Sequence, residues 1–133
     1  MADLSENHIA EVPDPRLAGN HVLVIEDDPM LAFAFEEAIV MAGCSVGIAS
    51  NVSAALSVLH GKQIDAAILD FSLGNKDSGR VAEALVNHGI PFILVTGHDL
   101  ESLKPPYSGH RALQKPIRIE TLWSELADLL LKR

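Results

Sequence analysis

The sequence predicts an α/β fold in which five parallel strands form one sheet covered by helices on both faces. Short apolar runs alternate with helical stretches along the chain, the order typical of such sheets. The run over residues 64–70 is mostly apolar, as expected of a strand buried on both faces of a parallel sheet. The helical stretches between the runs supply the crossover connections that parallel neighbours require.

The individual elements follow from these patterns. Apolar runs predict strands over residues 21–25, 44–49, 64–70, 91–95 and 111–114. Helices are expected over residues 29–42, from 50 or 51 to about 60, 79–87 and 119–131. Asp28 suits the N-cap of the first helix, and Pro29 suits its first position. Residues 98–103 are expected to form only a short or irregular fourth helix, because prolines follow at 105 and 106.

The chain of 133 residues is long enough for one domain with a hydrophobic core. We expect residues 1–19 to form a flexible N-terminal arm, because Pro13 and Pro15 disfavour a helix there, and residues 20–133 to form the domain. The net charge of −8 argues against nucleic acid as a partner. The lack of a long apolar run and of a secretory signal predicts a cytoplasmic protein without a membrane partner.

Polar side chains follow the predicted strands at their carboxyl ends, where ligands bind in open α/β sheets. Glu26 and Asp27 follow the first strand, Asp70 ends the third, Thr96 follows the fourth and Lys115 follows the fifth. Clustered carboxylates repel one another unless a cation neutralises them, and Mg²⁺ takes one or two carboxylates while keeping several waters. The remaining space suits a dianionic tetrahedral group, with Asp70 positioned as a nucleophile.

These features resemble the receiver domain of two-component response regulators over about residues 20–133. The matching segments are Ile-Glu-Asp-Asp-Pro at residues 25–29, Leu-Asp at 69–70, Val-Thr-Gly at 95–97 and Lys-Pro at 115–116. Each segment alone is a weak signal, but the four together, in this order on successive strand ends, are a strong one. The resemblance implies a flavodoxin-like (βα)5 three-layer sandwich with the strand order 2-1-3-4-5.

The resemblance also implies a phosphoacceptor and a metal site. Asp70 matches the residue that accepts a phosphoryl group from a phosphohistidine of a sensor histidine kinase or a phosphotransfer protein. Asp27 and Asp70 would ligate Mg²⁺ directly, Glu26 would act through a bound water, and the backbone carbonyl of Ser72 would be a further ligand. Such a domain catalyses only its own phosphorylation and dephosphorylation and signals to a downstream protein target.

Other positions match the phosphoryl-binding and tuning residues of the family. Thr96, Gly97 and Lys115 would contact the phosphoryl oxygens. Ser72 and His98 stand two residues after Asp70 and Thr96, at positions that tune hydrolysis of the acyl phosphate. The alternative for His98 is that it is a solvent-exposed loop residue.

The chain departs from the family pattern at Ala112, where typical receivers carry an aromatic residue that rotates with the threonine on activation. The stretch 91–98 resembles atypical receivers with a Phe-Ala-Thr-Gly signature, which lack this aromatic. Phe92, Thr96 and Gly97 match that signature, whereas Val95 replaces the alanine and His98 replaces the following aromatic.

Three functions remain to be compared. The first is a phospho-accepting signalling module, since we expect no output domain in 133 residues. The second is a receiver-like protein-binding module that is never phosphorylated, for which the alanine at 112 is the argument. The third is a phosphatase with an aspartate nucleophile, which is disfavoured because Ser72 stands where such enzymes carry a second aspartate. Homodimerisation stays open, with faces on the first and last helices as candidates.

Overall fold

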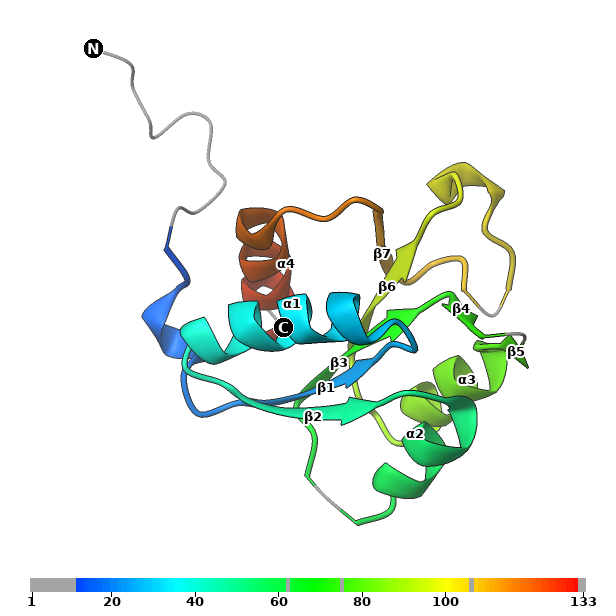
Figure 1. Cartoon of the computed structure of the whole chain (residues 1–133), viewed down its shortest axis with the longest axis horizontal. Helices are drawn as coiled ribbons and strands as arrows, with labels where there is room; N and C mark the ends of the chain where they lie inside the picture. Colours follow the sequence, from blue (N-terminus) through cyan, green and yellow to red (C-terminus); the bar gives the residue numbers. More distant parts are fainter. Residues whose placement is uncertain (1–11, 62, 75, 106, 132–133) are drawn as a thin grey trace.

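The computed structural model describes residues 12–61, 63–74, 76–105 and 107–131. Five parallel strands form one sheet in the order β2-β1-β3-β6-β7 (Figure 1). They are β1 (His21–Ile25), β2 (Ser45–Ala49), β3 (Ala66–Asp70), β6 (Phe92–Thr96) and β7 (Arg111–Gln114). Numbered among themselves, these strands have the order 2-1-3-4-5, so the predicted flavodoxin-like topology is confirmed.

Two pairs of helices cover the two faces of this sheet (Figure 1). The helices α1 (Pro29–Met41) and α4 (Ile119–Leu131) lie on one face, and α2 (Val52–Val58) and α3 (Gly79–Asn87) lie on the other. Successive strand residues point to opposite faces, so each strand contributes to both cores. β3 shows this directly, because Ile68 packs with the α1 and α4 side and Leu69 packs with the α2 and α3 side.

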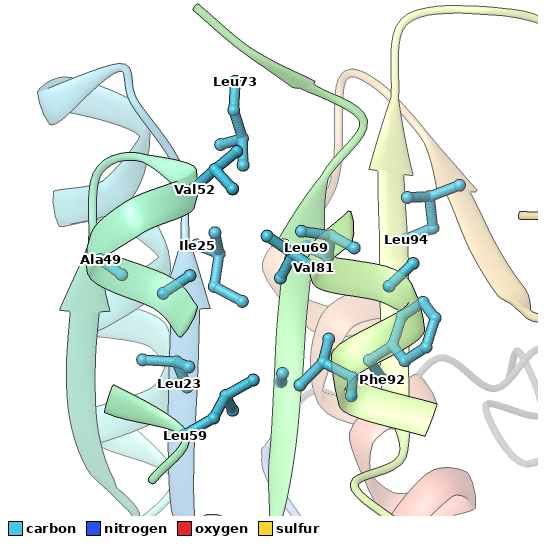
Figure 2. Packing of buried hydrophobic residues seen from close by; sticks show 14 of the residues in the cluster. Leu23, Ile25, Ala49, Val52, Leu59, Leu69, Leu73, Val81, Phe92 and Leu94 are labelled. Atoms are coloured by element: carbon cyan, nitrogen blue, oxygen red, sulfur yellow. The ribbon is translucent and has the colours of Figure 1, made fainter. Parts of the chain in front are cut away.

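Figure 2 shows the core on the α2 and α3 side, where aliphatic side chains from the sheet meet those of the helices. Leu23 and Leu69 are fully buried there, and Val81 of α3 belongs to the same cluster and lies beside Leu69 in Figure 2. Burying apolar side chains on both faces stabilises the central strands and holds their carboxyl ends in fixed positions.

The connection after β1 begins α1 in the way that its sequence predicts. Asp28 is the N-cap, and its side chain accepts a hydrogen bond from the Met30 amide at 3.0 Å. Pro29 occupies the first helical position, and Gly43, just after the helix, has a positive φ of 87°. This tight junction leaves Glu26 and Asp27 at the edge of the sheet instead of inside the helix.

The connection between β6 and β7 contains only one turn of 3-10 helix, η3 (Leu100–Ser102), among its described residues. The prediction of a short or irregular fourth helix is therefore confirmed. After β3 the chain forms a small antiparallel hairpin of β4 (Ser72–Leu73) and β5 (Lys76–Asp77). Gly74 lies between the two strands with a φ of 63°, a left-handed conformation that glycine adopts without strain.

The N-terminal segment differs from its prediction. Residues 1–11 of the predicted arm lie outside the described residues, but Pro15–Leu17 forms a 3-10 helix, η2. Leu17 is completely buried among residues of α1 and α4. The folded domain therefore begins before residue 20, because an apolar side chain in the arm completes the core. Across the described residues, every helix is too short or too polar to cross a membrane.

Candidate functional site

The carboxyl ends of four strands bring the predicted polar residues together. Glu26 follows β1, Asp70 ends β3, Thr96 ends β6 and Lys115 follows β7. One carboxylate oxygen from each of Glu26, Asp27 and Asp70 lies within 4.8 Å of the others. Residues up to 89 positions apart in the sequence, from Glu26 to Lys115, thus meet at one edge of the sheet.

Asp70 lies at the centre of this group and is 3% exposed. The ammonium nitrogen Nζ of Lys115 is 3.3 Å from its Oδ1. The backbone amide of Ser72 donates to the same oxygen at 3.2 Å. Both contacts place positive charge or a hydrogen-bond donor at the same carboxylate oxygen, so they hold the Asp70 side chain in place at the end of β3.

Asp27 is exposed at the rim of the site and is held by the hairpin that follows β3. Its Oδ2 accepts a hydrogen bond from the Gly74 amide at 2.9 Å. A Cβ atom placed on Gly74 would lie 3.8 Å from the same oxygen. Gly74 therefore orients Asp27 through its backbone, a role that the sequence reading did not assign to this residue.

Glu26 is 2% exposed, and its two oxygens have different surroundings. Oε2 accepts a hydrogen bond from the Asp28 amide at 3.1 Å. Oε1 is buried without a hydrogen-bond partner among the described residues, and the Lys115 Nζ atom is 3.8 Å from it. The pKa of Glu26 is raised to about 8, chiefly by burial and also by the neighbouring Asp70 carboxyl, against the lowering effects of the Asp28 amide and Lys115.

Thr96 connects the ends of β6 and β7. It is 1% exposed, its carbonyl accepts a hydrogen bond from the Lys115 amide at 2.7 Å, and its Oγ1 accepts from the His98 amide at 3.0 Å. Gly97 is exposed, and a Cβ atom built on it would meet nothing within 4 Å, so this part of the rim is open. The Thr96 carbonyl thus holds the backbone of Lys115 beside the end of β6.

The two predicted tuning positions, Ser72 and His98, are exposed at the rim. The His98 ring lies edge-on to the ring of Phe71, with centroids 5.1 Å apart. Ala112 is half-buried on β7 and packs against the cluster that contains Tyr107. The sequence reading singled out neither Phe71 nor Tyr107, because no local pattern indicates that these residues meet.

The donor set fits a hard divalent cation. Three carboxylates converge, and the buried Oε1 of Glu26 lacks the hydrogen bond that a buried polar oxygen normally has. Mg²⁺ prefers oxygen ligands and retains waters, which suits a cluster with one exposed member, Asp27. The residues present therefore fit the ion that the sequence predicts.

Comparison with known proteins agrees with this geometry. Residues 22–127 match the response regulator receiver domain. The solution structure of SdrG from Sphingomonas melonis Fr1 is 36% identical, with a TM-score of 0.71 over 84% of this chain and 97% of that chain. A search among curated proteins gave no match.

Two further solved structures share the fold at lower identity. A two-component response regulator from Clostridium difficile is 22% identical, with a TM-score of 0.75 over 84% of this chain and 95% of that one. The receiver domain of a Pseudomonas aeruginosa PAO1 sensor histidine kinase is 23% identical, with a TM-score of 0.73 over 85% and 98% of the two chains. That domain has a magnesium ion coordinated in its active-site cleft. With 106 consecutive positions matched to the family and its acidic cluster at the predicted strand ends, this chain belongs to the response regulator receiver domains.

Proposed function

We propose that the chain accepts a phosphoryl group on Asp70 from a phosphohistidine of a sensor histidine kinase or a phosphotransfer protein. The observation that carries this proposal is the 3.3 Å contact between Lys115 Nζ and Asp70 Oδ1 inside a cluster of three carboxylates. In the reaction, a carboxylate oxygen of Asp70 bonds to phosphorus while the phosphorus–nitrogen bond of the donor breaks. The released imidazole takes up a proton from solvent.

The roles of the surrounding residues follow from charge and position. Lys115 neutralises part of the phosphoryl charge, and the Thr96 hydroxyl and the Gly97 amide donate to its oxygens, because transfer of this group depends mainly on positioning and electrostatics. When bound, Mg²⁺ supplies further positive charge to the same oxygens. Asp27, Asp70 and the Ser72 carbonyl would hold the ion, and Glu26 would act through a bound water.

The lifetime of the phosphorylated state depends on how a water reaches the acyl phosphate. Hydrolysis breaks the bond between phosphorus and the Asp70 oxygen and releases inorganic phosphate. The exposure of Ser72 and His98 at the rim of the site supports a role for them, because a water that approaches Asp70 from solvent would pass their side chains. We therefore assign these two residues to tuning of dephosphorylation. In this proposal the chain catalyses only its own phosphorylation and dephosphorylation.

The proposal is tested by incubating the protein with Mg²⁺ and a small acyl phosphate donor. One phosphoryl group is expected per chain, in a linkage that alkali and hydroxylamine cleave. Asp70→Asn should abolish the label. Asp99→Asn is the matched control, because Asp99 is an exposed acid near the site whose side chain makes no helix-capping hydrogen bond, and it should be labelled like the native chain.

The outcomes separate the three functions considered. No label on native protein would contradict the proposal and favour a receiver-like binding module that is never phosphorylated. Repeated turnover of phosphate monoesters would instead indicate a phosphatase, although Ser72 supplies no carboxyl group for general acid catalysis. Pull-down with native and Asp70→Asn protein, each with and without donor, then identifies the downstream protein, and sedimentation of the same samples determines whether phosphorylation produces a homodimer.

A further inference from the structure

The connection from β6 to β7 is anchored in the core through one aromatic side chain. Among its described residues, 97–105 and 107–110, Tyr107 alone is buried, with 7% of its surface exposed. Leu103 is half-buried, and the other described residues of the connection are exposed. In Figure 1 the connection lies at the same end of the sheet as the hairpin that follows Asp70.

Tyr107 is linked to Phe71, the residue that follows the proposed phosphoacceptor, both directly and through Ser78. Its ring packs on the ring of Phe71 with centroids 4.8 Å apart. Its hydroxyl lies 3.2 Å from Oγ of Ser78, and Ser78 Oγ donates to the backbone carbonyl of Phe71 at 2.8 Å. Since the single hydroxyl hydrogen of Ser78 is used on that carbonyl, the Tyr107 hydroxyl is the donor to Ser78.

Phe71 and Thr96 link this anchor to the proposed phosphorylation site. Phe71 follows Asp70 directly, and its amide donates to the carbonyl of Val95 at 2.9 Å, next to Thr96. Thr96 Oγ1 accepts from the His98 amide, and the His98 ring rests edge-on against Phe71. A shift of either Asp70 or the Thr96 hydroxyl therefore acts on the rings that hold Tyr107.

The surroundings of Tyr107 leave room for rearrangement. A half-open cavity of about 250 Å³ lies between Phe71, His98, Leu103 and Tyr107. Ala112 contributes only a methyl group to the same apolar cluster, so β7 supplies no aromatic ring to it, whereas the connection supplies the ring of Tyr107. The turn η3 beside the cavity has no side-chain hydrogen bond from its N-cap residue, which lowers the free energy needed to unwind it.

We propose that Tyr107 is a positioning residue that couples the phosphorylation state of Asp70 to the conformation of residues 98–110, an inference that rests on the proposed function. In the unphosphorylated chain Tyr107 holds the connection against Phe71 and Ser78. When the Thr96 hydroxyl turns to a phosphoryl oxygen, His98 and Phe71 shift, the contacts of Tyr107 change and the connection rearranges. The exposed residues of the connection thereby report the state of Asp70 to a partner.

The test is amide hydrogen exchange of residues 98–110 with and without Mg²⁺ and the small phosphodonor, in the native chain and two variants. Tyr107→Phe keeps the ring and removes the bond to Ser78. Ser78→Ala removes the same bond together with the bond from Ser78 to the Phe71 carbonyl, and it removes no capping bond of α3, because the Ser78 side chain makes none to that helix. His110→Ala is the matched control, because it removes a ring contact of the connection that does not involve Phe71, a stack on Phe92 at 4.7 Å.

In the native chain, phosphorylation should change exchange in residues 98–110. Tyr107→Phe and Ser78→Ala should both still carry the label on Asp70. In both variants the amides of residues 98–110 should already exchange faster before labelling, and the change in their exchange on labelling should be smaller than in the native chain by about twofold or more. His110→Ala should keep the native change. If the role of Tyr107 were purely structural, the two variants would exchange faster by the same factor with and without the label on Asp70, and the change in exchange on labelling would equal that of the native chain.

Two results overturn the inference and differ from failure of the proposed function. A labelled native chain with the same exchange in both states would exclude coupling to this connection. A change as large in Tyr107→Phe and Ser78→Ala as in the native chain would exclude Tyr107 as its carrier. An unlabelled native chain would instead contradict the proposed function itself, and this inference with it.

Discussion

Glu26 has the most perturbed surroundings of the three clustered carboxyl groups. It is almost completely buried, one of its oxygens lacks a hydrogen bond among the described residues, and another carboxyl group lies beside it. Its pKa is raised from 4.5 to about 8, first by burial and then by Asp70, so without a cation it keeps a proton at neutral pH. The neutral form of a buried carboxyl has a lower free energy than the ionised form, because an unpaired buried charge costs several kcal/mol.

This pKa predicts how stability depends on pH in the absence of divalent cations. Between about pH 4.5 and pH 8 the folded protein keeps a proton at Glu26 that the unfolded chain has released. The free energy of unfolding should therefore fall as pH rises through this window, by at most about 1.4 kcal/mol per pH unit for one proton. Urea unfolding in a chelator at several pH values measures it. Glu26→Gln should flatten the slope, and an unchanged slope in that variant would assign the effect elsewhere.

At the scale of the element, the N-terminal turn η2 acts as part of the core. Leu17 is buried, its carbonyl lies 3.3 Å from the Cys44 sulfur, and η2 packs against α4. Ala18, just after η2, lies close to Gly43, just after α1: a Cβ atom on Gly43 would lie 2.8 Å from Cβ of Ala18. Trp123 of α4 donates to the Ala38 carbonyl of α1 at 2.8 Å, so η2, α1 and α4 support one another.

Removal of the Leu17 side chain should therefore destabilise the domain as a core substitution does. Leu17→Ala is expected to lower the free energy of unfolding by about 3 kcal/mol, because it removes buried methyl groups and leaves a cavity. Val12→Ala is the control, since Val12 is 72% exposed, and its effect should stay within about 0.5 kcal/mol. Denaturant unfolding measures both, and equal stability of the two variants would mean that η2 is not part of the core.

The elements that the sequence predicts well are those that depend on neighbours in the chain. Asp28 caps its helix as expected, and Asn51, one of the two positions at which the second helix was expected to begin, caps that helix, because a capping side chain reaches only two or three residues ahead. The ends of the strands follow from where apolar runs stop, and they bring Asp70 and Lys115 together once the topology is parallel. Local patterns thus predict most of the fold and the five polar residues of the site.

The remaining features depend on contacts between distant parts of the chain. Leu17 is apolar in a proline-rich stretch, and only the space between α1 and α4 explains its burial. Tyr107 meets Phe71 across 36 positions, and the Gly74 amide reaches Asp27 across 47. Neither contact has a periodicity or spacing of its own, so a single sequence carries no signal for it.

At the scale of the whole molecule, the net charge of −8 is concentrated in part where three carboxylates share one edge of the sheet. Folding brings these groups together and gives them only one close ammonium among the described residues, that of Lys115. In the unfolded chain Asp70 lies far from Glu26 and Asp27, so the three groups repel one another less. A cation that binds the cluster therefore binds the folded state selectively and stabilises it.

Mg²⁺ at ten times its dissociation constant should add about 1.4 kcal/mol to the free energy of unfolding, and so raise the melting temperature by roughly 4 °C. Mg²⁺ competes with the proton on the carboxyl cluster. At one fixed Mg²⁺ concentration, the increase in melting temperature should therefore grow as pH rises towards about 8, where Glu26 ionises. Thermal unfolding with and without millimolar Mg²⁺ measures the shift. Asp27→Asn should reduce it and Asp99→Asn should not. A melting temperature that does not change on addition of Mg²⁺ at any pH would refute the assignment of the cluster as a metal site.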